Sequence, residues 1–273
     1  MADAQPGRKL SAAERTEIIL TELHRAGFAS VTALSETLGV SDMTVRRDIR
    51  RLAGNGELRM VHGGASLPHG NLRTATFAGR AEQAAEAKEA IAEAAVRLIG
   101  PTTTIALDSG TTCYAVSTML DRDFSGCVIT HSIPVLQQML HYRHATVLGL
   151  GGELMVENQV LLGPSTTAAA AALSIDAFFL GANSIDERGV YLHGNRERAV
   201  KSALMDSASQ VVLLIDSSKA QRTAPVRLAE LNRITTLITD RPLPRKIYQA
   251  CDKHSVDVIV ADSLEVAGSS RIR

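Results

Sequence analysis

The sequence predicts an α/β protein in two parts, a small helical N-terminal part and a larger part built on a mostly parallel β-sheet. The chain has 273 residues, more than the roughly 100–200 of one ordinary domain. From about residue 80 onward, short β-branched runs alternate with helical patterns, as in βαβ units. The first 66 residues contain three short helical patterns and end in a Gly-rich segment. We expect the parts to span 1–66 and 80–273, joined by a Pro- and Gly-containing linker over 67–79.

Composition narrows the classes to which the chain can belong. Of its residues 45% are hydrophobic, and 29 basic side chains balance 29 acidic ones. No apolar run approaches the roughly 18 residues that span a bilayer, and the first ten residues lack the apolar core of a signal peptide. Because the three cysteines form no paired motif, we expect a cytoplasmic protein with reduced thiols. A nucleic-acid surface would have to be a local patch, and 3% aromatic residues disfavour single-strand stacking modules.

The first two helical patterns form an apolar pair. Ile19 and Leu23 share one face of a helix over about residues 13–24, which Gly27 ends. Leu34 and Leu38 continue the apolar spacing in a second helix, and Gly39 breaks that helix. These two helices precede a third of different character.

The third helix has one apolar face and one cationic face. Ser41 stands at its N-cap, and Val45, Ile49 and Leu52 follow at the spacing of a buried stripe. A helix that is polar and cationic outward near its N-terminus, crossing a two-helix pair, suits reading of the DNA major groove. Arginine can pair with guanine or phosphate, and Thr44 can reach a base edge. The outward side chains are Met43, Thr44, Arg46, Arg47, Arg50 and Arg51.

The segment after this helix favours the DNA-binding interpretation over a merely solvated cationic helix face. Residues 57–65 alternate like a β-ribbon and contain a Gly pair, so they could form a wing that approaches the DNA backbone. A metal-binding role for His62 is disfavoured because no second ligand stands nearby at useful spacing. The residues expected to bind DNA are Ser41, Met43, Thr44, Arg46, Arg47, Arg50, Arg59 and His62.

In the larger part, strands and helices alternate. Such alternation predicts right-handed crossovers and a mostly parallel sheet covered on both faces. Ligands of such sheets bind beyond the carboxyl ends of the strands. The expected strands are 103–107, 128–130, 146–150, 175–180, 211–215, 235–238 and 256–260. The expected helices are 81–99, 112–120, 133–140, 164–173, 196–208 and 245–254.

The tips that follow these strands are polar and Gly-rich. Residues 108–112, Asp-Ser-Gly-Thr-Thr, run into a helix, where backbone amides and the helix dipole would hold an anion such as phosphate. Taken alone, this turn could equally be an ordinary hydroxyl-capped helix start. Similar tips recur at 130–132, 151–153, 181–183 and 216–219. Together they predict one pocket.

Other chemistry is disfavoured. Leu154 occupies the place of the third glycine in a dinucleotide-binding fingerprint, so that motif fails. His141 and His144 have no Cys or carboxylate partner nearby, so we expect a surface pair and no metal site. The Gly-x-Ser-x-Gly motif of a nucleophile elbow is absent around Ser109. We expect no cofactor.

A set of N-terminal residues keeps a specific spacing: Arg15, Ile19, Leu23, Ser41, Thr44, Val45, Arg46, Arg47, Asp48 and Ile49, followed by His62, Gly63, Gly64 and Ala65. This pattern resembles the DeoR family of bacterial transcriptional regulators, which implies a winged helix-turn-helix. Met60 stands where the family often has a basic residue, and Ala53 and Gly54 stand where Glu is frequent.

The strand tips, in this order, resemble the sensor domain of the same family, which is similar in fold to ribose-5-phosphate isomerase and typically binds a phosphorylated sugar. His131 replaces the family's usual Asn, and Ala220 and Gln221 replace its usual Phe-Gly. The resemblance implies that residues 108–112 hold the phosphate, with the sugar beside charged groups. The implied effector-binding residues are Asp108, Ser109, Gly110, Thr111, Thr112, Thr130, Ser132, Gly151, Gly152, Glu197, Lys201 and Lys219.

The sequence therefore predicts a bacterial, ligand-responsive transcriptional regulator, associated with the nucleoid when bound to DNA. We expect a repressor of a carbohydrate catabolism operon, controlled by a phosphorylated sugar, acting on double-stranded operator DNA as a homo-oligomer, dimer or tetramer. The alternative is a sugar-phosphate isomerase-like enzyme with a DNA-binding appendage, in which Glu197 would be the base. The related isomerases carry an Asp-Gly-Ala-Asp segment where this chain reads Leu-Gly-Ala-Asn at 180–183, so we expect no enzyme. A scaffold without a ligand is disfavoured by the clustered tips.

Overall fold

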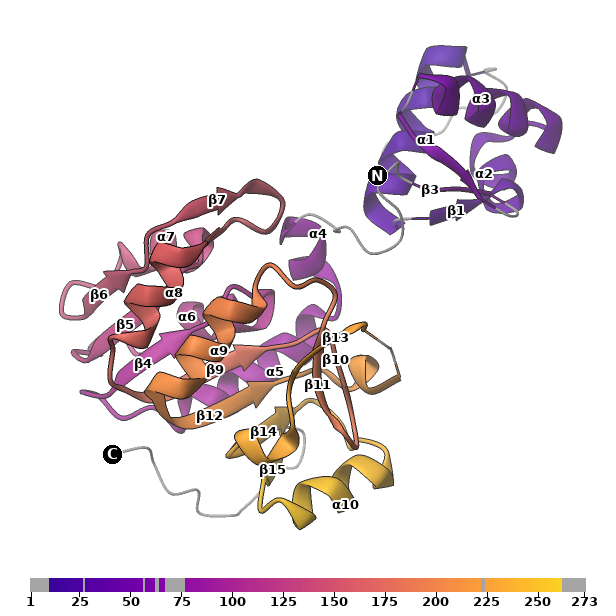
Figure 1. The fold of residues 1–273 in the computed structure, drawn as a ribbon. Helices are drawn as coiled ribbons and strands as arrows, with labels where there is room; N and C mark the ends of the chain where they lie inside the picture. The colour runs from indigo at the N-terminus through magenta and orange to yellow at the C-terminus, as the bar shows by residue number, and fades with distance from the viewer. Residues whose placement is uncertain are drawn as a thin grey trace. The chain divides into compact units, whose positions relative to one another are not determined.

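Residues 10–26, 28–55, 57–61, 64–66, 77–221 and 224–261 are described by a computed structural model. The chain divides into two units, Met1–Arg80 and Ala81–Arg273 (Figure 1). None of the helices in these ranges combines the length and apolar character that crossing a membrane requires. The predicted linker 67–79 lies mostly outside the described residues, and its last three residues belong to helix α4 (Phe77–Glu82).

The N-terminal unit is a helix-turn-helix with a small antiparallel sheet. Its helices bury the predicted apolar stripes, Ile19 and Leu23 from the first and Val45, Ile49 and Leu52 from the third. The predicted β-ribbon is formed by two strands, and a third strand between the first two helices joins it, which was not predicted. The elements are α1 (Ala12–Ala26), β1 (Phe28–Ser30), α2 (Val31–Leu38), α3 (Asp42–Gly54), β2 (Arg59–Val61) and β3 (Gly64–Ser66), with sheet order β1-β3-β2.

The larger unit contains a seven-stranded sheet in which every pairing is parallel. All seven predicted strands are present and all belong to this sheet, so the α/β class is confirmed. In spatial order the strands are β15 (Asp257–Val260), β14 (Thr236–Thr239), β12 (Ala208–Leu214), β9 (Ile175–Gly181), β4 (Thr104–Leu107), β5 (Cys127–Thr130) and β6 (Thr146–Gly149).

The helices follow the predicted alternation with one correction. A single helix over 81–99 was wrong: Ala84 adopts a left-handed conformation with φ 50°, which separates α4 from α5. The Lys88 ammonium donates to the Gln83 carbonyl and holds this turn. Nothing local predicts the break, because alanine favours helix. The helices are α5 (Ala85–Val96), α6 (Thr111–Met119), α7 (Ile133–Met139), α8 (Pro164–Ala171), α9 (Arg198–Ser207) and α10 (Arg245–Lys253).

Two smaller sheets were not predicted. One is an antiparallel sheet of β10 (Ser184–Asp186), β11 (Gly189–Leu192) and β13 (Val226–Ala229). The other is a hairpin of β7 (Glu153–Met155) and β8 (Val160–Leu162), whose connection contains the short 3-10 helix η1 (Val156–Asn158). Two further 3-10 turns are η2 (Ser217–Gln221) and η3 (Leu231–Arg233).

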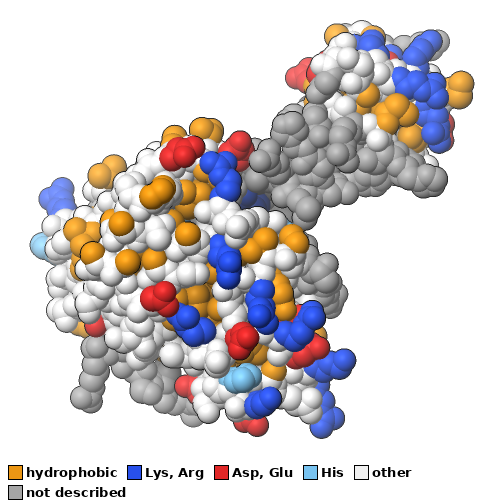
Figure 2. All heavy atoms as spheres, in the orientation of Figure 1, with side chains coloured by type: hydrophobic (Ala, Val, Ile, Leu, Met, Phe, Trp, Pro, Cys, Tyr) orange, Lys and Arg blue, Asp and Glu red, His pale blue; other side chains and the backbone are white. Residues whose placement is uncertain are grey.

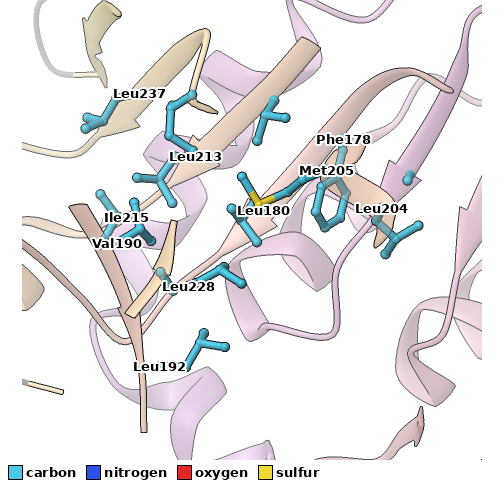
Figure 3. Packing of buried hydrophobic residues seen from close by; sticks show 14 of the residues in the cluster. Phe178, Leu180, Val190, Leu192, Leu204, Met205, Leu213, Ile215, Leu228 and Leu237 are labelled. Carbon is cyan, nitrogen blue, oxygen red and sulfur yellow. The ribbon is translucent and has the colours of Figure 1, made fainter. Parts of the chain in front are cut away.

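The central strand β9 is buried on both faces, as a parallel strand between helical layers must be. Phe178 and Leu180 pack with Leu204 and Met205 of α9 in one hydrophobic cluster (Figure 3). Phe179, one residue along, belongs to a second cluster that includes side chains of α5 and α6. Burial on both faces fixes the register of the strands, and with it the height at which each strand ends.

Candidate functional site

The carboxyl ends of neighbouring strands lie level with one another. Leu107 at the end of β4 pairs with Thr130 of β5 on one side and Phe179 of β9 on the other. Thr130 in turn pairs with Gly149, at the end of β6. Side chains that follow these strands are therefore brought to one edge of the sheet, as the sequence predicted.

A buried carboxylate stands at the centre of this edge. Asp108 is fully buried and accepts hydrogen bonds from the amides of Ser109, at 2.8 Å, and Gly181, at 2.9 Å. A Cβ at position 181 would lie 3.5 Å from Asp108 Oδ2, at ordinary van der Waals distance. The Lys201 ammonium donates to Asp108 Oδ2 at 2.5 Å and to the Gly181 carbonyl at 3.0 Å.

Lys201 forms ion pairs with two acidic side chains, Asp108 and Glu197. Burial works to lower the pKa of Lys201, but the carboxylates of Asp108 and Glu197 outweigh it, and that pKa is raised. Burial likewise works to raise the pKa of Asp108, but the charge of Lys201 and the hydrogen bonds from Lys201 and the Ser109 amide hold it below its usual value. Glu197 Oε2 lies 3.4 Å from the Lys201 ammonium. The ionised pair of Asp108 and Lys201 is therefore the favoured state.

His131, at the end of β5, faces this group. Its side chain has no solvent exposure, and Nε2 lies 3.6 Å from Asp108 Oδ1. Neither ring nitrogen has a hydrogen-bond partner among the described residues. Burial lowers the pKa of His131 and keeps the imidazole neutral at pH 7. The sequence singled out His131 only as a departure from a family pattern and did not place it among the binding residues.

The turn between β4 and α6 has the predicted form. Gly110 is the N-cap of α6 and makes no side-chain cap, so the amides of Thr111, Thr112 and Cys113 have no intrahelical acceptor. The amide of Ser109 was expected to be available to a ligand, but it donates to the Asp108 carboxylate instead. Three orphan amides at the positive end of a helix suit an anion.

The hydroxyls of two predicted pocket residues are engaged by the protein itself. Thr130 donates to the Leu107 carbonyl at 2.7 Å and accepts from the Ser132 amide at 3.1 Å. Ser132 is the N-cap of α7 and accepts from the Val135 amide. The exposed Gly151 and Gly152 open the next strand tip. The hydroxyls of Thr130 and Ser132 therefore hold the backbone at this edge of the sheet.

The β7–β8 hairpin covers the end of β5. The Leu161 amide donates to the His131 carbonyl at 2.8 Å, and the Ile133 amide donates to the Gln159 carbonyl at 2.9 Å. From the same hairpin, Asn158 Nδ2 donates to Glu197 Oε1 at 2.6 Å. The hairpin is thus tied both to β5 and to the residue that precedes α9.

Lys219 lies on the neighbouring strand tip. Its ammonium is 3.4 Å from Asp216 Oδ2, and its side chain is 22% exposed. Asp216 is buried, and burial works to raise its pKa, but the Lys219 charge and nearby hydrogen bonds hold it below its usual value. The structure therefore brings Lys201 into contact with both Asp108 and Glu197 and places Lys219 in a separate pair.

The exposed face of α3 carries the predicted DNA-binding side chains. Ser41 caps the helix and accepts from the Thr44 amide, so its hydroxyl is partly engaged. Met43 is 71% exposed, and Arg46, Arg47 and Arg50 are exposed as well. Figure 2 shows basic side chains gathered along one side of this unit. The Arg59 side chain and His62 lie outside the described residues.

An ion pair that holds α3 was not predicted. Arg15 of α1 donates to both carboxylate oxygens of Asp48, at 2.7 and 3.3 Å, and Asp48 is buried in α3. A sequence signal was available, since Asp48 falls within the apolar stripe and a buried carboxylate needs a partner. Among the described residues, no group of three or more His, Cys, Asp or Glu side chains is placed to hold a metal.

Solved structures give only weak likenesses. A ribose 5-phosphate isomerase A of Methanocaldococcus jannaschii aligns at 18% identity and a TM-score of 0.36, over 48% of this chain and 52% of that one. At that score the alignment carries no argument. The α/β class and the parallel sheet rest on the strands themselves, and the isomerase type stays a prediction.

Curated relatives align over almost the whole chain. The HTH-type transcriptional regulator GlpR of Haloferax volcanii is 32% identical over 90% of this chain and 97% of its own. The L-fucose operon activator of Haemophilus influenzae is 29% identical over 90% and 99%. The glycerol-3-phosphate regulon repressor of Escherichia coli K12 is 28% identical over 90% and 97%.

Two family models match the two units. The DeoR-like helix-turn-helix domain matches residues 15–71, which contain all but the first three residues of α1, the elements from β1 to β3 and the exposed face of α3. The DeoR C terminal sensor domain matches residues 83–241, which contain Asp108, His131, Glu197 and Lys201. The predicted resemblance is confirmed, and the chain belongs to the DeoR family of transcriptional regulators.

Proposed function

We propose that the protein represses a carbohydrate operon and that a phosphorylated sugar, bound at the carboxyl edge of the sheet, controls its affinity for operator DNA. The observation that carries the effector site is the buried group of Asp108, His131 and Lys201 beside three orphan amides of α6. The amides and helix dipole would take the phosphate. Polar side chains beside them would take the sugar.

Within this site the residues have different tasks. Asp108 is satisfied by its own chain, so it holds Lys201 and the Ser109 turn in place. Thr111 and Thr112, at the helix start, are the hydroxyl donors to phosphate. Glu197 and Lys219 are partly exposed and supply charge at the margin. Gly151 leaves room at the next strand tip, whereas a Cβ at Gly152 would collide with Thr166 and the Leu162 carbonyl.

The N-terminal unit reads double-stranded DNA through α3. Arg46, Arg47 and Arg50 are exposed on its cationic face, where arginine can contact guanine or phosphate. Met43 and Thr44 stand at the N-terminal end of the helix and reach base edges or a thymine methyl. Arg59 and His62 of the wing are proposed to contact the DNA backbone.

Catalysis is not part of the proposal. An isomerase would need a carboxylate free to move a proton of the sugar. Glu197 is the candidate, and it is held by Lys201 and Asn158. Residues 180–183, with Asn183 at the end, bring no carboxylate to the site. Regulation without turnover fits these residues.

We further propose a homo-oligomer held through the larger unit. One small DNA reader per chain gives useful specificity when two or more chains occupy repeated half-sites. Leu148 on the edge strand β6 is exposed, and so are Leu140, Leu154 and Val156 nearby in sequence. Sedimentation at micromolar concentration should give a dimer or larger, and a monomer that still binds operator with nanomolar affinity would contradict this.

The direct test combines DNA and effector. Operator sequences are selected from random duplexes by the purified full-length protein, and binding is measured by gel shift. A thermal-shift screen of phosphorylated sugars follows, in which a ligand at about 100 times its Kd adds about 2.7 kcal/mol of stability. The stabilising sugar phosphate should change operator affinity and give no isomerised product. Absence of both selected DNA and stabilising sugars would overturn the proposal.

A further inference from the structure

His131 poses a question that the proposed phosphate site does not answer. Its imidazole is completely buried, and neither Nδ1 nor Nε2 has a hydrogen-bond partner among the described residues. A buried polar group without a partner is costly, and most such groups in proteins are satisfied by protein, water or ligand. The ring also lies within the charged group of Asp108, Lys201 and Glu197. A water molecule or a bound ligand at this strand edge would complete it.

The surroundings decide which nitrogen carries the proton. A neutral imidazole has one N–H donor and one acceptor lone pair. Nε2 faces Asp108 Oδ1 at 3.6 Å, and an ionised carboxylate only accepts. The proton is therefore assigned to Nε2, where it points toward the carboxylate and adds to its stabilisation. Nδ1 is left as an acceptor.

Because Nδ1 is an acceptor, its partner must be a hydrogen-bond donor. A phosphate dianion offers only acceptor oxygens, so it cannot complete Nδ1 of a neutral imidazole. A hydroxyl group can, because it donates one hydrogen bond. Lys201, the nearest cation, already donates to Asp108 and to the Gly181 carbonyl.

We propose that His131 Nδ1 accepts a hydrogen bond from one hydroxyl of the sugar, so that the end of β5 recognises the polyol while the start of α6 recognises the phosphate. This inference rests on the proposed function and adds an orientation to it. His131 becomes a specificity-determining residue for effectors that carry a hydroxyl at one position. Deoxy analogues that lack this hydroxyl leave Nδ1 unsatisfied.

The test compares ligands and variants in a cycle. Ribose 5-phosphate, glucose 6-phosphate, fructose 6-phosphate and glycerol 3-phosphate are titrated calorimetrically into the full-length protein, and the tightest is compared with its singly deoxygenated analogues. For wild type, one analogue should bind about fivefold to tenfold more weakly than its parent. In His131→Phe, which has no acceptor nitrogen, parent and analogue should bind equally.

Two controls keep a folding defect apart from loss of recognition. His131→Asn supplies an amide oxygen as an acceptor and should keep the preference for the parent sugar. Inorganic phosphate should bind wild type and His131→Phe with equal affinity, since His131 does not contact it. Nitrogen-15 spectra of wild type report the protonated ring nitrogen directly, without a variant, and should keep the proton on Nε2 after the sugar binds.

The outcomes separate the two proposals. If a sugar phosphate binds wild type and His131→Phe still discriminates against the same analogue, His131 does not read a hydroxyl. Weaker binding of inorganic phosphate to His131→Phe would place the ring at the phosphate end and overturn the orientation. If none of the sugar phosphates binds wild type at saturating concentration, the proposed effector fails, and the assignment of His131 fails with it.

Discussion

The two units differ in the burial of their functional charged side chains: those on α3 are exposed, and those at the centre of the sheet edge are buried. On α3, Arg46, Arg47 and Arg50 stand in solvent, so each can be replaced without leaving an unpaired group behind. At the edge of the parallel sheet, Asp108 and Lys201 are buried, and each depends on the other. Solvated charges contribute little to stability and are available to a partner. Buried charges are strongly coupled to folding, and removal of one exposes the cost of burying the other.

The largest expected effect is that of Lys201→Met. This change leaves Asp108 buried without its cation, which should lower the free energy of unfolding by about 3–5 kcal/mol at pH 7. Chemical denaturation followed by circular dichroism measures it. Lys246→Met on the exposed face of α10 is the matched control, and it should change stability by less than about 0.5 kcal/mol. Equal effects of the two changes would contradict the comparison.

The same variant has a defined dependence on pH. In wild type the lowered pKa of Asp108 stabilises the fold above its unfolded pKa of about 3.9, and this contribution is lost as pH falls through the folded value. Without Lys201, burial should raise the pKa of Asp108, so protonation favours the folded variant. The stability difference between wild type and Lys201→Met should therefore shrink from pH 7 to pH 4.

Arg15→Met tests the one buried ion pair described within the DNA-reading unit. It strands Asp48 in the core and should destabilise this unit by about 2–4 kcal/mol, less than Lys201→Met because Arg15 is 12% exposed. Arg50→Ala, on the exposed face of α3, is the control. It should leave the denaturation curve unchanged and weaken DNA binding. Unfolding by both variants alike would remove the distinction between the two arginines.

Thr111→Ala should weaken effector binding about tenfold or more, since it removes a hydroxyl donor to a charged phosphate, worth about 1.5–3 kcal/mol. Operator affinity without effector should stay that of wild type, because Thr111 lies outside the helix-turn-helix. Reciprocal coupling then requires more effector to change operator binding by the same amount. Calorimetric titration with equal affinities for both proteins would remove the α6 turn from the site.

Arg47→Ala should weaken operator binding at least fivefold, since one base contact is worth about 1–3 kcal/mol. Stability should not change, because Arg47 points away from the buried stripe of α3. Gel shifts measure the affinity and circular dichroism the fold. Unchanged affinity in a folded variant would exclude Arg47 from the interface.

Lys219→Ala should have the smallest effect, about threefold on effector affinity. Its flexible, partly exposed ammonium acts as a point charge and is already paired with Asp216. A loss as large as that of Thr111→Ala would move Lys219 to the centre of the site.

Much of the fold could be predicted because periodicity reports burial. The β-branched runs predicted every strand of the parallel sheet, and the spacing of Val45, Ile49 and Leu52 predicted the buried face of α3. The β7–β8 hairpin and the β10-β11-β13 sheet escaped, because their strands stand outside the strand-helix alternation on which the prediction rested. The turn at Ala84 escaped because alanine favours helix and carries no signal for a left-handed conformation.

The sequence predicted where in the fold the site lies, but it did not predict the hydrogen bonds and ion pairs within the site. The rule that ligands bind beyond strand ends identified Asp108 and the α6 turn. The hydrogen bond from Thr130 to the Leu107 carbonyl, 23 residues away, and the buried, unpartnered ring of His131 depend on neighbours that are distant in the sequence. A single sequence does not specify such pairs. Asp48 is a case between these two. Its position in an apolar stripe indicates that the carboxylate needs a partner, but does not identify that partner as Arg15.

The strand order also sets when the charged group can form during synthesis. The sheet starts at β4, adds β5 and β6 on one side, and receives β9 and β12 on the other only later in the chain. Asp108 emerges 93 residues before Lys201, and non-local pairing of this kind is slow. A nascent chain that ends before α9 holds Asp108 without its cation, so the carboxylate opposes early collapse of the half-made sheet. We therefore expect the sensor unit to close only after α9 has left the ribosome, whereas the contacts within the helix-turn-helix can form before.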